Sequence, residues 1–302
     1  MNKESIDALL KKINDTSTGA GNPRAKQVVN RIVRDLFYTI EDLDVTPDEF
    51  WSALNYLTQA GQSGEYGLIA AGLGFEHFLD LRMDEAEAKA GLTGGTPRTI
   101  EGPLYVAGAP RSEGHAKLDD GTTPGEPLIM GGRVYDEGGQ PIVGAVVEVW
   151  HANHLGNYSY FDKSQAPFNL RRTIVTDAEG KYCFQSMVPV GYSVPPEGQT
   201  KQLLDLLGRH GNRPAHIHFF ISAPGHRKLT TQINIAGDPY LWDDFAFATR
   251  DGLVPPMRKA EADEAGQFGL DGPFQKIDFD FTLLRDSTSL RTSEVDRIRA
   301  EG

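Results

Sequence analysis

The chain has 302 residues, 39% of them hydrophobic, so it can form one large domain or two ordinary ones around a substantial core. Its formal net charge is -12 and it contains no run rich in lysine and arginine, which argues against nucleic acid as a partner. The single cysteine, Cys183, excludes an intrachain disulfide and fits a reducing cytoplasm. No stretch reaches the ~20 apolar residues of a membrane span, and the first residues lack the apolar core of a signal peptide.

Residues 1 to about 90 have the spacing of helices. Asn22 can cap a helix that begins at Pro23, and apolar residues recur at helical spacing over residues 28–40. Residues 46–49, Thr-Pro-Asp-Glu, form a capping box that predicts a second helix, and a third apolar run covers residues 68–79. These helices carry more apolar surface than so small a unit needs, so the excess could cover the second domain or a second copy of the chain.

Near Gly91 glycine and proline begin to punctuate the chain and the helical period ends. We therefore predict a helical domain over residues 1–92, which would be a dimerisation and linker domain if its apolar excess covers a second copy of the chain, and a second domain over residues 93–302. In the second domain, short β-branched and aromatic segments alternate with turn signals, which predicts strands at 128–135, 145–151, 172–177, 182–187, 215–222, 229–235 and 276–284. Seven such strands favour an antiparallel β-sandwich, and the whole chain is predicted to have an α+β fold.

One short helix is expected to interrupt these strands. Thr200 can cap its first turn, and Gly208 can end it. Its leucines at 203, 204 and 207 are predicted to face inward and to pack in the core.

Two histidines lie in the segment Pro-Ala-His-Ile-His-Phe-Phe-Ile at residues 214–221. The segment alternates and is rich in aromatic and β-branched residues, so it predicts a strand in which residues two apart face the same side. His216 and His218 would then present their side chains about 7 Å apart along one face. Because neutral imidazole is the commonest metal ligand in proteins, the pair predicts a metal site. Two ordinary strand histidines on a solvated face are the alternative.

Two phenols, Tyr158 and Tyr192, accompany the imidazoles. A phenol titrates near pH 10 in water, so only a strongly acidic metal keeps it ionised at pH 7. A hard, anionic oxygen suits Fe(III) better than Zn(II) or Cu(I). A zinc hydrolase is a weaker alternative, since it would need a carboxylate or a third histidine beside the pair and an open position for water.

Several segments together resemble the intradiol ring-cleavage dioxygenases, and within that family the catechol 1,2-dioxygenase group. They are Gly-Asn-Tyr-Ser-Tyr-Phe-Asp at 156–162, Val-Pro-Val-Gly-Tyr at 188–192, the run 207–218 that ends Arg-Pro-Ala-His-Ile-His, and Leu-Thr-Thr-Gln-Ile at 229–233. The resemblance extends over nearly the whole chain, including the helical N-terminal part and residues 99–105. The long run before the histidines is highly specific, whereas His-x-His alone would be a weak signal.

The resemblance implies one non-haem Fe(III) ion per subunit, held by Tyr158, Tyr192, His216 and His218. It implies insertion of both atoms of O2 into catechol, with cleavage between the two hydroxyl-bearing carbons to give cis,cis-muconate. That reaction belongs to cytoplasmic catabolism of aromatic compounds through the beta-ketoadipate pathway. The family also implies a homodimer that pairs through the N-terminal helices and can hold a phospholipid at the helical interface.

By the same resemblance, Arg213 stabilises negative charge that develops during the reaction, and Gln232 lies near the reacting atoms. Tyr192 is the phenol expected to leave the metal and accept a substrate proton, a role that the residues alone do not distinguish from Tyr158. The substrate pocket is expected to comprise Leu68, Ala71, Ile100, Pro103, Leu104, Phe245 and Ala246. Small residues in such a pocket leave room for ring substituents, so we expect tolerance of methylcatechols.

Three alternatives remain open from the sequence. Tyr160 is close enough to Tyr158 to be the ligand, although the family pattern Gly-x-Tyr-Ser-x-Phe-Asp selects Tyr158. The substrate could be a chlorocatechol or hydroxyquinol, but residues 103–110 resemble the catechol type better. A β-sandwich that binds or dimerises without a metal is a third alternative, and the intact set of two tyrosines and two histidines argues against it.

Overall fold

The structure is a computed structural model, and it describes residues 1–16, 19–119, 121, 123–260, 264, 266–287 and 299–301. The chain divides into two compact units, Met1–Ser63 and Gly64–Gly302, which we call the N-terminal unit and the C-terminal unit. The proposed domain division at residues 92 and 93 stays a prediction.

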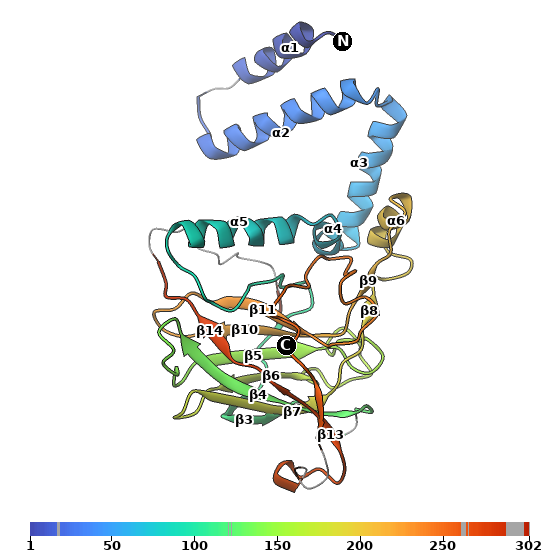
Figure 1. Cartoon of the computed structure of the whole chain (residues 1–302). Helices are drawn as coiled ribbons and strands as arrows, with labels where there is room; N and C mark the ends of the chain where they lie inside the picture. Colours follow the sequence, from blue (N-terminus) through green and yellow to red (C-terminus); the bar gives the residue numbers. More distant parts are fainter. Residues whose placement is uncertain are drawn as a thin grey trace. The chain divides into compact units, whose positions relative to one another are not determined.

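The N-terminal unit consists of α1 (Lys3–Asp15), α2 (Pro23–Asp42) and α3 (Pro47–Gln62) (Figure 1). Helix α2 begins as predicted: the Asn22 side chain accepts hydrogen bonds from two backbone N–H groups of the first turn. Helix α3 has the predicted capping box, in which Thr46 and Glu49 each bond the other's backbone N–H. These local bonds satisfy N–H groups that a helix start otherwise leaves unpaired.

The apolar surplus of these helices is present in the structure. Every residue of α2 is at least partly exposed. The large exposed hydrophobic residues of α2 and α3 are Val28, Val29, Ile32, Leu36, Phe50, Trp51, Leu54 and Leu57. Apolar faces of this size are typical of surfaces that another molecule covers.

The C-terminal unit begins with α4 (Tyr66–Gly72) and α5 (Phe75–Lys89). Sequence reasoning predicted a single apolar run over residues 68–79, but the helix breaks at Gly74, which has a φ of 79°. Glycine adopts this left-handed conformation at little cost, and it lets the chain change direction between the two helices. Helix α5 lies alongside the β11 edge of the sheet (Figure 1), where Glu87 pairs with Arg227.

The interrupting helix, α6 (Gln199–Leu206), exists, but two expectations about it were wrong. Gly198 rather than Thr200 is its N-cap, and the Glu65 carboxylate accepts the N–H groups of residues 199 and 200 instead. A carboxylate far away in the sequence replaces the local N-cap side chain, so the residues around the helix start do not predict it. Of the three leucines only Leu204 is fully buried, while Leu207 is exposed.

The remaining strands form two main sheets. The five-stranded sheet has the order β11 (Leu229–Asn234), β10 (His216–Ser222), β5 (Val146–His151), β6 (Arg171–Val175) and β2 (Arg111–Glu113). The six-stranded sheet has the order β12 (Arg258–Ala260), β13 (Phe274–Asp278), β4 (Pro127–Asp136), β7 (Lys181–Met187) and β3 (His115–Lys117), with β14 (Phe281–Leu283) also on β4. Two short strand pairs complete the described strands: β1 (Val106–Ala107) with β15 (Ala300–Glu301), and β8 (Tyr192–Ser193) with β9 (Asn212–Arg213). A 3-10 helix, η1, covers Gly266–Phe268.

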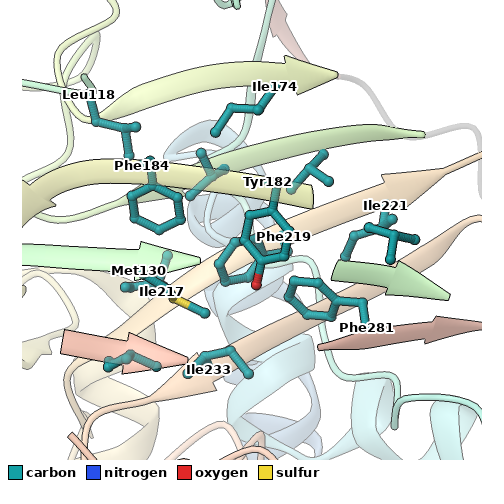
Figure 2. Packing of buried hydrophobic residues seen from close by; sticks show 14 of the residues in the cluster. Leu118, Met130, Ile174, Tyr182, Phe184, Ile217, Phe219, Ile221, Ile233 and Phe281 are labelled. Atoms are coloured by element: carbon teal, nitrogen blue, oxygen red, sulfur yellow. The ribbon is translucent and has the colours of Figure 1, made fainter. Parts of the chain in front are cut away.

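The two main sheets pack face to face, which confirms the predicted sandwich. Figure 2 shows their shared core, to which β10 and β11 contribute Ile217, Phe219, Ile221 and Ile233, and the opposite sheet contributes Met130, Tyr182, Phe184 and Phe281. Since alternate residues of a strand face opposite sides, residues 216, 218 and 220 of β10 lie on the outer face of the five-stranded sheet. The functional residues of this strand are therefore held on a rigid surface outside the main core.

The pairs β4–β7, β10–β5, β10–β11 and β5–β6 are antiparallel, as predicted, but several other pairs are parallel. Strands β2 and β3 pair in parallel with β6 and β7, and β13 and β14 both pair in parallel with β4. The predicted single strand over residues 276–284 is split into β13 and β14, which pair with β4 in one continuous parallel register and are separated by residues 279 and 280.

Gly132 is needed beside the break between β13 and β14, where the Phe279 backbone lies close to β4. A Cβ atom placed on Gly132 would stand 1.9 Å from the backbone oxygen of Phe279, which cannot move aside without shifting the sheet. We expect Gly132→Ala to lower the free energy of unfolding by about 3 kcal/mol, the upper part of the range for overpacking. Denaturant unfolding tests this, with Gly272→Ala as the control because no atom lies within 4 Å of its added Cβ. Equal stability of the two variants would contradict the steric argument.

Asp80 on α5 predicts a pH-dependent change in stability. Its side chain is 8% exposed, and burial, partly offset by Arg98, raises its pKa from 3.8 to about 7. Between these values the folded state holds a proton that the unfolded state releases, so stability falls as the pH rises toward 7. The difference between the two pKa values lowers the free energy of unfolding by on the order of 4 kcal/mol above pH 7.

We therefore expect Asp80→Asn to stabilise the fold more at about pH 8 than at about pH 5, measured by denaturant unfolding at both values. Asp84→Asn is the control, because Asp84 pairs with Arg98 and Arg250 and its loss should destabilise the fold at both. A gain from Asp80→Asn that does not depend on pH would show that Asp80 is ionised in the folded state.

Candidate metal centre

The candidate site lies on the outer face of the five-stranded sheet. His218 of β10 is in register with Trp150 of β5 and with Gln232 of β11, so the three side chains form a row across the sheet. The indole of Trp150 stacks on the His218 ring, with the centroids 4.9 Å apart and the planes at 5°. The row fixes the orientation of His218 by packing on one side.

The two imidazoles converge as the alternation of the strand predicted. Their Nε2 atoms are 3.0 Å apart, and both rings are buried. The Nδ1 atom of His216 lies 2.6 Å from the Pro214 carbonyl oxygen, which can only accept, so Nδ1 carries the hydrogen and Nε2 carries the lone pair. Burial and then Arg213 lower the pKa of His216 to about 3, and burial and then His216 hold the pKa of His218 well below its ordinary value. Both rings are therefore neutral, the form that binds metals.

Both predicted phenols lie beside the histidines. The Tyr158 hydroxyl is 3.4 Å from Nε2 of His216, and the centroids of the Tyr158 and Tyr192 rings are 5.6 Å apart. Tyr158 is 4% exposed, whereas Tyr192 on β8 is half-buried. Burial raises the pKa of the Tyr158 phenol well above 10, so this group is neutral unless a strong Lewis acid binds it.

The four donors fit a trivalent metal by their chemistry. Nε2 of His216 presents its lone pair 3.0 Å from Nε2 of His218, so a cation bound by both nitrogens would replace the hydrogen bond between the two rings. No group of three or more His, Cys, Asp or Glu side chains in the described part of the chain could hold a metal. Tyr158 places a phenol oxygen 3.4 Å from Nε2 of His216, and phenolates favour Fe(III) over Zn(II).

Arg213 extends from β9 into the same site. Its Nη1 atom lies 3.1 Å from Nε2 of His216 and 3.5 Å from the Tyr192 hydroxyl, and its Nη2 atom donates to Oε1 of Gln232 at 2.8 Å. Both Arg213 and Gln232 are buried. The structure therefore brings together all the residues that were predicted to bind the metal or to act on the substrate.

Asp244 is a member of this cluster that sequence reasoning missed. Its carboxylate accepts from Nε and Nη2 of Arg213 at 3.2 and 3.1 Å, and also from the backbone N–H groups of Ala246 and Ala248. Burial opposes the charge on Arg213, but Asp244 together with the phenols of Tyr192 and Tyr158 outweighs burial, so the pKa of Arg213 lies above its ordinary value. Asp244 thus neutralises Arg213 and orients it. Asp244 lies in a loop without periodic sequence pattern, and nothing in the neighbouring residues distinguishes it from other loop aspartates.

The predicted pocket residues are partly assembled. Five of them lie in one apolar cluster with Val194, Leu204 and Ala248, namely Leu68, Ala71, Ile100, Phe245 and Ala246. Leu104 instead packs against the cluster of Trp150 and Tyr158, nearer the metal ligands. Pro103 is exposed, and it lies beside α4, 3.7 Å from where a Cβ on Gly67 would stand.

Other tyrosines and histidines are placed elsewhere. Tyr160 makes an edge-to-face contact with Phe161, and the ammonium nitrogen of Lys163 lies 4.5 Å from the centroid of the Tyr160 ring, so the contacts of Tyr160 are with its own loop. His151 is buried and is held between Ser186 and the Ala152 carbonyl, each at 2.7 Å.

A polar cleft of about 330 Å³ opens beside the half-buried phenol of Tyr192. It is lined by Gly191, Tyr192, Ser193, Asn212, Arg213, Asp238, Pro239 and Tyr240.

Known proteins share this fold and chain length. Residues 100–284 match the family model described as "Dioxygenase", and residues 22–91 match "Catechol dioxygenase N terminus". The chain belongs to the intradiol ring-cleavage dioxygenase family. It is 78% identical to catechol 1,2-dioxygenase 2 of Acinetobacter lwoffii over 88% of this chain and 97% of that protein. The crystal structure of wild-type catechol 1,2-dioxygenase from Acinetobacter radioresistens superposes with a TM-score of 0.95 at 59% identity, covering 100% of this chain and 99% of that one.

Relatives that are named for other substrates are less similar to this chain. Chlorocatechol 1,2-dioxygenase of Rhodococcus opacus is 34% identical, over 85% of this chain and 99% of that protein.

In the described part of the chain, no helix combines the length and the apolar character needed to cross a membrane.

Proposed function

We propose that this chain is a catechol 1,2-dioxygenase, which cleaves catechol with O2 to cis,cis-muconate at one Fe(III) ion bound by Tyr158, Tyr192, His216 and His218. The observation that carries the proposal is the convergence of two neutral imidazoles and two phenols beside a buried arginine. The identity of 78% to a curated catechol 1,2-dioxygenase supports the substrate.

When bound, the metal would act as a Lewis acid that ionises its ligands and prepares the substrate for reaction with O2. The two phenols are suited to different tasks. Tyr158 is fully buried, which favours a permanent ligand. Tyr192 is half-buried, lies 3.5 Å from Nη1 of Arg213 and borders the polar cleft, so its oxygen can take a substrate proton and exchange it with solvent. This contrast supports assigning the proton transfer to Tyr192.

Arg213 and Gln232 would act on the substrate rather than on the metal. Arg213 donates two hydrogen bonds to Asp244 and one to Gln232, so its guanidinium needs no rearrangement when negative charge develops on the ring. Donors fixed in advance in a buried site stabilise such charge more strongly than mobile or solvated ones. Gln232 keeps its amide group oriented through a second bond from Nε2 to Asn234.

The apolar cluster around Ala71 and Ala246 would form the wall against the catechol ring. Because a flat apolar wall discriminates against a methyl or chloro group by only ~1–3 kcal/mol, methylcatechols should also be substrates. Cleavage of chlorocatechol or hydroxyquinol is the second candidate; the lower identity of 34% to a chlorocatechol enzyme makes it weaker.

We also propose that two copies pair through the apolar faces of α2 and α3, where a phospholipid could be held, and that the enzyme acts in the cytoplasm in the beta-ketoadipate pathway. The exposed residues that support this pairing include Ile32, Leu36, Trp51 and Leu54. Apolar faces of this kind are costly to leave in water and cheap to bury against each other.

The visible absorption spectrum of the purified, iron-loaded protein tests the proposal. We expect a broad tyrosinate-to-Fe(III) charge-transfer band that moves to longer wavelength when catechol is added without O2, followed by muconate formation when O2 enters. Iron content should be one ion per chain. A colourless protein with full iron loading would contradict ligation by phenolates, and a colourless protein that binds no iron would favour the metal-free binding module.

A further inference from the structure

Arg171, the first residue of β6, is a buried charge that the proposed reaction does not use. Its side chain is 1% exposed. All three guanidinium nitrogens donate to neutral oxygens: Nε to the Ser159 hydroxyl at 2.9 Å, Nη2 to the Ser159 carbonyl at 3.0 Å, and Nη1 to the Leu104 carbonyl at 2.8 Å. The hydrogen bonds are satisfied, but none of them supplies a negative charge.

Among the described residues, no carboxylate forms an ion pair with Arg171. The ionisable groups that act on its charge are the phenols of Tyr158 and Tyr105. Tyr105 donates its hydroxyl hydrogen to Glu148 and so stays protonated. The Tyr158 ring, by contrast, lies with its centroid 5.8 Å from Cζ of Arg171. Burying a charge without an opposite charge beside it costs free energy. An anion that forms beside Arg171 in the working protein would offset this cost.

Arg213 does not need that anion, since Asp244 already neutralises it. Of these two buried arginines near the phenols, only Arg171 lacks a carboxylate partner. It is also bonded twice to Ser159, the residue that follows Tyr158, so its position is coupled to the backbone that carries the phenol. Its third bond ties the same guanidinium to the segment that carries Leu104.

We propose that Arg171 is a positioning residue of the metal centre: it supplies the positive counter-charge for the Tyr158 phenolate and fixes the backbone that presents it. This rests on the proposed function, in which a trivalent metal ionises Tyr158. Arg171 favours the metal-bound form of the site because its charge is balanced only in that form. It is not one of the four proposed metal ligands, and it acts through Tyr158.

Binding of Ga(III), a redox-inert trivalent ion, to the iron-free protein tests this inference without any turnover. The difference absorbance in the ultraviolet reports how many tyrosines ionise as the metal binds, and its titration gives the affinity. We expect Arg171→Met to weaken Ga(III) binding by about 10- to 100-fold, the effect typical of losing an opposite charge close to an ionised group. Arg171→Lys keeps the charge and should lose about fivefold or less.

Arg172→Met is the matched control, because Arg172 is the next residue of β6 and the alternation of the strand turns it to the opposite side. It should bind Ga(III) within about twofold of the unmodified protein. The decisive comparison repeats Arg171→Met in a Tyr158→Phe background. If Arg171 acts through the phenolate, its replacement should there change the affinity by less than about threefold.

The outcomes separate this inference from the proposed function. An equal loss in both backgrounds, or no loss in either, would overturn the role of Arg171. If Arg171→Met does not fold, the same comparison is made with Arg171→Lys, for which a loss as large as that expected for methionine would overturn the counter-charge. If Ga(III) ionised no tyrosine in the unmodified protein, the phenolate centre itself would be refuted.

Discussion

Replacing Arg213 by methionine is expected to lower kcat for catechol by about 10²- to 10³-fold while the protein keeps its iron. The guanidinium lies 3.1 Å from Nε2 of His216 and 3.5 Å from the Tyr192 hydroxyl, close enough to act on charge that develops at the site. It is not a metal ligand, so iron content and the charge-transfer band should persist. Steady-state kinetics together with iron analysis measure both.

A complication of this variant is that it leaves Asp244 buried without its cation. Breaking such a pair costs about 3–5 kcal/mol of stability, which could be mistaken for a catalytic effect. The double variant with Asp244→Asn removes the stranded charge, so it should regain stability yet remain as slow as Arg213→Met alone. Recovery of kcat in the double variant would show that Arg213 acts through stability. Arg111→Met, at an exposed position on β2, is the control for loss of an arginine.

The sequence alone predicted the ligand histidines because a strand has a period of two residues. The alternation over residues 214–221 places His216 and His218 on one face, and the structure has their Nε2 atoms 3.0 Å apart. The starts of α2 and α3 were predictable for a similar reason, since Asn22 and the Thr46 capping box act within one helical turn. Local rules suffice wherever the partner of a group is a few residues away.

The phenols could be placed only by resemblance. Nothing in the residues themselves separated Tyr158 from Tyr160, since both lie in one irregular loop. In the structure Tyr158 packs with Trp150 and Phe220 on the outer face of the sheet, while Tyr160 contacts its own loop. Tyr160 itself has a φ of 74°, an unusual backbone conformation for a non-glycine residue that its loop pattern does not predict.

The residues that sequence reasoning missed all depend on distant partners. Asp244 acts on Arg213, which is 31 positions away, and Arg171 acts on a loop and on a carbonyl 67 positions away. The failed cap at Thr200 has the same cause, because Glu65 supplies its place from 135 positions away. From the sequence alone, a charged residue at the start of a strand, such as Arg171, is expected to be exposed to solvent. Its burial can be predicted only when the segments that pack over it are known.

Replacing Tyr192 by phenylalanine is expected to reduce turnover of catechol by about 10³-fold or more, with a change of colour in the iron-loaded protein. The variant keeps the ring that packs 5.6 Å from Tyr158, so the fold and the other three ligands should stay in place. It removes both a phenolate ligand and the oxygen that we expect to accept a substrate proton. Both effects act on the reaction, whereas only the first acts on the colour.

The same change at Tyr158 and at Tyr160 separates these two contributions. Tyr158→Phe should also alter the charge-transfer band, but it removes a fully buried phenol that has no place in proton transfer, so it should bind iron more weakly. Tyr160→Phe is the matched control and should retain colour and turnover, because its ring contacts Phe161 and Lys163 instead. Near-normal turnover in Tyr192→Phe would refute its assignment as ligand and base, and loss of colour in Tyr160→Phe would move the ligand to that residue. Absorption spectra and initial rates on the three proteins, each with its iron content measured, decide between these outcomes.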